Sequence, residues 1–144
     1  MKLIFSRKGF DSQYGGVPSP ILSDGTLLPL PIPSKHGRLL RDIQSSVGPL
    51  HALVSDLTGG KIGSDTMVHL DPDLQSLSVP RQAGWQPSLG QVAAAQGHLA
   101  KQGVGRGDLF LFFGWFRQAE IIGGRWRYVP GAPDIHSLFG WLQV

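Results

Sequence analysis

The chain has 144 residues, the length of a single domain, which is enough to bury a hydrophobic core. Charged residues make up only 16% and hydrophobic residues 41%, so the abundant glycine and proline indicate long ordered loops and exclude a largely disordered chain. The sequence has no cysteine, which excludes disulfides, thiolate nucleophiles and cysteine zinc sites, and its net charge of +3 permits a polyanionic partner without requiring one.

The apolar patch at residues 1–5 is too short for a signal peptide, and no run approaches the length of a membrane span. We therefore expect a cytoplasmic protein with no membrane partner. The chain stops at Val144 directly after an apolar run. We accordingly expect residues 1–144 to be one domain that is truncated at its C-terminal end.

A first strand is predicted at residues 2–6, followed by a polar, glycine-rich loop at residues 6–16. Such a loop is a common way to build an anion or nucleotide site, because backbone N–H groups and basic side chains converge on phosphate oxygens. The spacing matches neither the P-loop nor the dinucleotide fingerprint. The alternative is a solvated turn in which Asp11 and Ser12 bond the local backbone, and composition alone favours this alternative.

The next segments are predicted from turn and periodicity signals. Residues 17–33 are predicted to form an extended hairpin that turns at Asp24-Gly25, and residues 34–46, which are polar and basic, to form a loop. A helix is predicted over residues 49–57, because apolar residues recur at helical spacing and Gly59-Gly60 can end it.

Three potential metal ligands, His69, Asp71 and Asp73, follow in a predicted loop. Imidazole and carboxylate suit several divalent ions. However, Asp-x-Asp beside proline is also common in plain turns, and no second cluster stands at a defined spacing. We therefore favour the turn and assign no metal.

A second helix is predicted from Ser88, because residues 88–91 form a capping box, and Gly103 stands where a C-terminal glycine belongs. Its buried face is expected to carry Leu89, Val92, Ala93, Gln96, Leu99 and Ala100. A buried amide needs partners, so Gln96 could orient a ligand or bond a loop carbonyl. His98 lies off this stripe and is expected at the surface.

The apolar run at residues 109–113 predicts a central strand, since it lies between the turn signals Gly107 and Gly114. Phe113-Gly114-Trp115-Phe116 is partly repeated at residues 139–142, and Gly123-Gly124 signals a hairpin between the two copies. We predict an α+β fold with an antiparallel sheet, one or two packed helices and long Gly/Pro-rich loops. The sheet should contain residues 2–6, 108–116 and 137–143.

Basic and aromatic residues alternate at residues 125–128, so that a strand would place two arginines on one face and Trp126 and Tyr128 on the other. Exposed aromatics beside basic groups suit nucleic-acid binding. The alternative is that the rings belong to the core and the arginines are solvated. The sequence leaves the two interpretations level.

Several motifs together resemble one family. They are Ser-Arg-Lys-Gly-Phe-Asp-Ser at 6–12, Gly-Gly-x-Pro-Ser-Pro-Ile-Leu at 15–22, Asp-Leu-Thr-Gly-Gly at 56–60, His-Leu-Asp-Pro-Asp-Leu at 69–74 and Gly-Asp-Leu-Phe-Leu-Phe-Phe-Gly-Trp-Phe at 107–116. Over essentially its whole length the chain resembles the nucleotide modification associated domain family, third type, of bacteria and their phages. Members of that family continue past Val144.

The resemblance implies an association with systems that modify bases in DNA, and hence a nucleotide or DNA partner. It specifies no settled reaction, cofactor or protein partner. The candidate catalytic residues are Asp11, His69 and Asp71. The candidate substrate-binding residues are Ser6, Arg7, Lys8, Ser12, Gly15, Gly16, Gln91, Gln96 and Trp115.

The roles of these residues are our inference. Arg7 and Lys8 would hold phosphate, and Trp115 would stack on a base. Asp11 would bond a ribose hydroxyl or act as general base, with His69 helping in proton transfer. The loop at 6–16 should line the site, with residues 69–71 near it.

Three functions remain open. We favour an enzyme-like domain that processes a nucleotide or base. The runner-up is a non-catalytic reader of modified bases, because the strands at 107–113 and 139–144 are similar to barrel strands of PUA-like domains. The third is transfer of ADP-ribose from NAD to DNA, for which Glu120 is the only glutamate available.

Overall fold

A computed structural model of the chain describes residues 1–91 and 93–144, and its longest element is strand β7 (Leu109–Ile122). Alternate residues of β7, from Phe110 to Phe116, are buried, while those between them are partly exposed. This alternation is what a strand with one face on the core requires. The prediction of a central strand at residues 109–113 is therefore confirmed.

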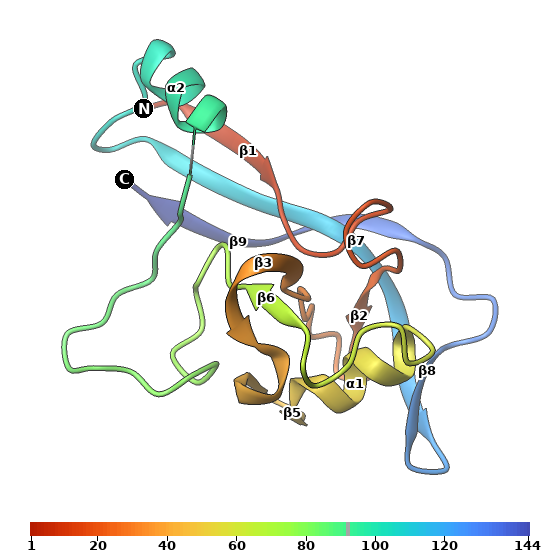
Figure 1. The fold of residues 1–144 in the computed structure, drawn as a ribbon. Helices are drawn as coiled ribbons and strands as arrows, with labels where there is room; N and C mark the ends of the chain where they lie inside the picture. Colours follow the sequence, from red (N-terminus) through yellow and green to blue (C-terminus); the bar gives the residue numbers. More distant parts are fainter. Residues whose placement is uncertain (92) are drawn as a thin grey trace.

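Four strands pair with β7 to form one sheet (Figure 1). They are β1 (Leu3–Arg7), β2 (Ser19–Ile21), β8 (Arg125–Tyr128) and β9 (Ile135–Gln143). The core face carries Phe110, Phe112 and Phe116, whereas the outer face carries Phe5 and Trp141, which are 63% and 65% exposed.

The α+β fold is confirmed, and the sheet contains the three segments predicted for it. One detail of the prediction is wrong, because β1 and β2 run parallel to β7 and only β8 and β9 run antiparallel. A parallel pair needs a long crossover connection. Residues 8–108 supply that connection between β1 and β7, whereas Gly123 and Gly124 join β7 to β8 in the predicted tight hairpin with positive φ angles of 59° and 77°.

Asp108 ties the beginning of β1 to the beginning of β7. Its carboxylate accepts hydrogen bonds from the backbone N–H groups of Lys2 at 2.7 Å and Gly105 at 3.0 Å. These two hydrogen bonds lower the pKa of Asp108 below its ordinary value of 3.8. The glycine-rich turn before β7 therefore fixes the N-terminal strand in its register.

Helix α1 (Leu50–Leu57) lies in a second layer under the sheet and confirms the helix predicted there (Figure 1). Its buried residues are those of the predicted apolar stripe, Leu50, Leu53, Val54 and Leu57. Gly59 and Gly60 have positive φ angles, and the Gly60 N–H donates to the Ser55 carbonyl at 2.8 Å, which ends the helix.

The loop predicted over residues 34–46 is wrong for most of its length. Strand β3 (Ile32–Leu39) pairs with β6 (Met67–His69), a short 3-10 helix η1 (Leu40–Asp42) follows, and β4 (Gln44–Ser45) pairs with β5 (Gly48–Pro49). The polar residues of β3 face solvent on a two-stranded ribbon, so they gave no alternating apolar signal.

The turn predicted at Asp24-Gly25 is present, since Gly25 N–H donates to the Leu22 carbonyl.

Helix α2 (Ala93–Lys101) lies beside β1 and away from α1 (Figure 1). The expected start at Ser88 is wrong, because the backbone of Ser88 exchanges two hydrogen bonds with Asp73 instead of capping a helix. The expected buried stripe is also wrong, since Gln96 and the alanines are exposed, and Val92 lies outside the described residues. Small alanine side chains offer little area to bury. Gly103 does end the helix, with φ 63°.

Neither helix in the described part of the chain has the length and apolar composition needed to cross a membrane.

Candidate functional site

A groove of about 590 Å³ runs between strand β1 and helix α2. Its walls combine three kinds of side chain. The apolar ones include Ile4, Leu99 and Phe110, the neutral polar ones are Ser6, Gln91 and Gln102, and the basic ones are Lys2 and His98. This mixture can hold a ring against apolar walls while amides and cations contact its polar parts.

Strand periodicity explains how β1 contributes to the groove. Ile4 and Ser6 are half-buried and alternate with the exposed residues Leu3 and Phe5, which also border the groove, and Ile4 lies opposite Phe110 in the register of the sheet. The Lys2 ammonium donates to the carbonyl of Gly103 at 2.5 Å, just beyond the C-terminal end of α2. Lys2 therefore links the strand to the helix while keeping further donors for a ligand.

An ion pair between Lys8 and Asp71 adjoins the groove. Lys8 Nζ lies 2.7 Å from one carboxylate oxygen of Asp71, and the other oxygen accepts the Gly90 N–H at 3.1 Å. Both side chains are only 14% exposed. Gly90 precedes the groove residue Gln91, and Lys8 lies two residues after Ser6. Asp71 thus joins three distant segments of the chain beside the groove.

Replacing Asp71 with asparagine is expected to lower the free energy of unfolding by about 2 kcal/mol, because the charge of Lys8 loses its partner in a poorly hydrated place. This is less than a fully buried pair would lose, since some solvent remains. Urea denaturation of this variant, of Lys8→Met and of the double variant would measure the coupling.

Asp65→Asn is the matched control for Asp71→Asn. Asp65 pairs with Arg41, but their side chains are 79% and 51% exposed, so the expected loss is about 0.5 kcal/mol or less. Equal losses of unfolding free energy in Asp65→Asn and Asp71→Asn would contradict the stabilising role that we assign to the ion pair between Lys8 and Asp71.

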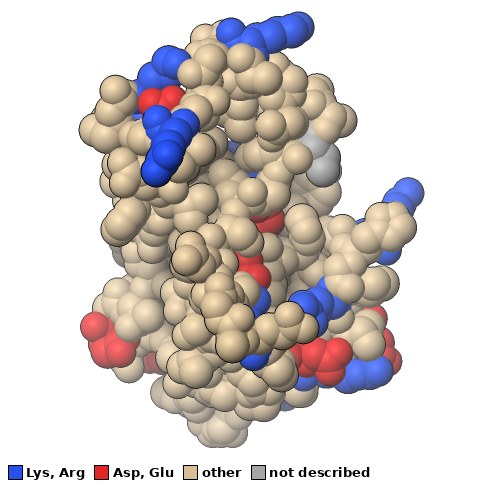
Figure 2. Space-filling model, turned by 90° about the vertical axis from the view of Figure 1, so that its left-hand side faces the viewer, with Lys and Arg blue, Asp and Glu red and all other residues tan. Residues whose placement is uncertain are grey.

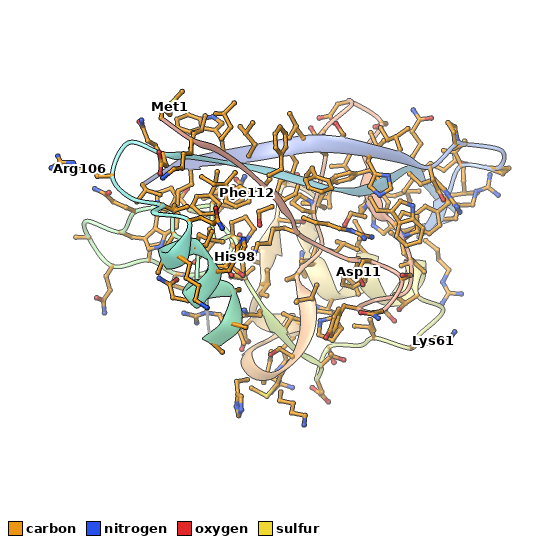
Figure 3. The ribbon with its side chains drawn as sticks, turned by 90° about the horizontal axis from the view of Figure 1, so that it is seen from above. Met1, Asp11, Lys61, His98, Arg106 and Phe112 are labelled. Carbon is orange, nitrogen blue, oxygen red and sulfur yellow. The ribbon has the colours of Figure 1, made fainter. Side chains whose placement is uncertain are left out.

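The predicted polar loop forms a closed turn. The Asp11 carboxylate accepts the N–H groups of Gln13 at 2.8 Å and Tyr14 at 2.7 Å, and Gly16 N–H donates to the Asp11 carbonyl. This is the local bonding of the turn alternative. Figure 3 shows Asp11 well apart from His98 and helix α2. Ser12 is exposed, and Gly15 packs against the ring of Phe10.

Other predicted site residues do not line the groove. Arg7 is exposed on the outer face of the sheet, opposite Phe113 in the register, and Trp115 is partly exposed beside His136. His69 is exposed at the end of β6, and Gln96 is exposed on α2. The predicted site residues that the structure brings together are therefore Ser6, Lys8, Asp71 and Gln91.

Ala95, His98 and Gln102 were not predicted to line the groove, although Gln91 was assigned to the site. Ala95 and His98 are three residues apart in α2, which places them on one face of the helix, and Gln102 follows its last residue. This stripe was the available signal. It was overlooked because the apolar stripe that includes Gln96 was expected to face the sheet.

Three arginines of β7 and β8, including the two of the alternating basic and aromatic segment, are paired with carboxylates. Arg117 lies 2.5 Å from Asp134, Arg127 lies 2.8 Å from Glu120, and Arg125 lies 3.8 Å from Asp56. The hydrogen bond from Arg117 holds the pKa of Asp134 below its usual range. Trp126 and Tyr128 are partly buried and pack against the hydrophobic core, and burial raises the pKa of Tyr128.

Figure 2 shows one face of the molecule, most of which is uncharged. Within residues 1–91 and 93–144, no three His, Asp or Glu side chains gather closely enough to hold a metal ion.

Comparison with protein families matches residues 2–144 to the family described as nucleotide modification associated domain 3. Comparison with curated proteins gives no match, and comparison with solved structures gives none either.

Proposed function

Since this chain belongs to the nucleotide modification associated domain 3 family, we propose that it binds a nucleotide, free or within DNA, in the groove between β1 and α2 and takes part in its modification. The observation that carries this proposal is the meeting of Ser6 and Gln91 in one groove, with the Lys8–Asp71 pair beside them. Ser6 and Gln91 were both assigned to a binding site from positions that lie far apart in the chain.

The groove residues suit the parts of a nucleotide. Lys2 supplies a cation for phosphate, while Lys8 is paired with Asp71 and holds the chain segments beside the groove together. The amides of Gln91 and Gln102 can bond the edge of a base that lies against the apolar wall. His98 supplies an imidazole, the side chain used most often for proton transfer. We assign proton transfer to His98, while Asp11 is engaged in its own turn.

The second candidate function is a reader of modified bases. The exposed ring of Trp141 on the outer face of the sheet favours it, because exposed aromatics can stack on bases. The pairing of Arg117 and Arg127 with carboxylates weighs against it. ADP-ribosyl transfer ranks third, since its candidate glutamate, Glu120, is engaged with Arg127.

Blocking the groove tests the binding proposal. Ala95 lines the groove and is exposed, so tryptophan at this position fills the space without disturbing the core. We expect Ala95→Trp to weaken the binding of 5′-mononucleotides or short DNA at least tenfold, measured by calorimetric titration, which corresponds to about 1.4 kcal/mol.

The matched control for Ala95→Trp is Ala94→Trp, because Ala94 is also exposed on α2 but does not line the groove. It should bind as the wild type does. Equal affinities of the two variants would place the nucleotide elsewhere.

Catalysis is tested by incubating the protein with DNA and candidate nucleotide donors and analysing the nucleosides by mass spectrometry. A modified nucleoside that disappears with His98→Asn, while binding is retained, supports an enzyme. An unchanged nucleoside profile together with tight DNA binding would favour the reader.

A further inference from the structure

A second cavity, of about 230 Å³, is more enclosed than the groove and shares no lining residue with it. Its walls come from the segment after the Asp24-Gly25 turn, the region from Ile43 to Leu50, the loop after β6, and strand β9. Most of the lining is apolar, including Leu28, Ile43, Leu50, Leu70, Leu74 and the ring of Phe139.

The cavity offers no free charge. Asp73 is the one charged residue in its described lining, and Arg81 holds it with two hydrogen bonds of 2.7 and 2.5 Å. The two side chains are 18% and 14% exposed. Arg81 also donates to the Gln75 carbonyl at 2.8 Å and lies 4.1 Å above the ring of Trp85. Arg81 therefore neutralises Asp73 and fixes the loop that forms one wall.

A polar group in this lining has no partner. Ser78 is only 9% exposed and lines the cavity, yet its hydroxyl makes no hydrogen bond to any described residue. The Ser78 hydroxyl is not among the fully buried unpartnered atoms, so it is open to the cavity and can donate to or accept from an occupant. Gln44 and Ser45 add further neutral polar groups at the rim.

We propose that this cavity binds a neutral heteroaromatic ring of about the size of a purine base. Its volume exceeds the roughly 150 Å³ that accommodates benzene in an apolar protein cavity. Phe139 and the leucines supply the apolar walls that a flat ring needs, and Ser78 supplies a hydrogen bond to a ring nitrogen or exocyclic group. The described residues of the lining include no cation to hold phosphate, so the site favours a base over a nucleotide.

This site goes beyond the proposed function and is tested apart from it. Adenine is the probe, with indole as a ring of similar size that lacks adenine's ring-nitrogen acceptors and amino group. In a titration of the isotope-labelled protein followed by NMR, we expect adenine to shift the backbone signals of Gln44, Ser45 and Ser78. Ser78→Ala should weaken adenine binding by about threefold to tenfold and weaken the binding of indole, which has only its N–H to offer, by less.

Leu28→Trp, which fills the cavity, should abolish adenine binding at these signals, with retained folding checked by thermal denaturation. Ala95→Trp, which fills the groove, should leave this binding unchanged. No adenine-induced shifts at Gln44, Ser45 and Ser78, shifts with indole alone, or no effect of Ser78→Ala would each overturn the proposal. None of these outcomes would bear on nucleotide binding in the groove.

Discussion

Phe112→Ala is expected to lower the free energy of unfolding by about 3–5 kcal/mol, the range for removing a fully buried aromatic ring. Phe112 is 0% exposed in the middle of β7. Its ring centroid lies 6.3 Å from those of both Phe110 and Phe139, and its backbone lies opposite Ser6 of the groove. Urea denaturation followed by fluorescence would measure the loss.

Phe113→Ala is the control for Phe112→Ala, because the next residue of β7 has the same side chain on the partly exposed outer face. The smaller area that it buries predicts a clearly smaller loss. Equal losses at the two positions would contradict the assignment of the core face.

Gly15→Ala is the second change with a large expected effect. A Cβ at Gly15 would lie 2.3 Å from ring atoms of Phe10, a core residue that is 1% exposed, and the φ angle of Gly15 is +91°. Both the backbone conformation and the collision oppose the substitution, so we expect a loss of about 3–4 kcal/mol in thermal or urea unfolding.

Gly16→Ala separates these two causes. Its φ angle is +76°, but a Cβ at this position would meet nothing within 4 Å. Gly16→Ala should therefore lower the free energy of unfolding only by the backbone cost of about 1–2 kcal/mol. If Gly15→Ala were no worse than Gly16→Ala, the packing of this turn on Phe10 would be refuted.

Elements set by local sequence signals were predictable. The apolar run of β7, the leucine and valine spacing of α1 and the Gly123-Gly124 turn each specify their own conformation. The parallel direction of β1 was not predictable in this way, because it depends on how a connection of about a hundred residues returns to the sheet. Strand β3 was missed because its pairing comes from β6 and not from its own polar residues.

The candidate site was predicted only in part for a related reason. Motifs pointed to Ser6, Lys8, Asp71 and Gln91, and the structure places them at or beside one groove. Composition had favoured a plain turn at Asp11, and the hydrogen bonds of its carboxylate agree. His98 was correctly expected at the surface, since it is exposed, but its place along the groove depends on how α2 lies beside β1, which its own helical spacing does not specify.

We propose that a nucleotide binds in the groove between β1 and α2. Chemical-shift mapping of the isotope-labelled protein, titrated with a 5′-mononucleotide, tests it most directly because it reports which face of the sheet the ligand contacts. We expect the largest shifts at Ser6, Gln91 and His98, with the indole signals of Trp115 and Trp141 unchanged. Shifts at these two indoles, with Gln91 and His98 unmoved, would contradict it.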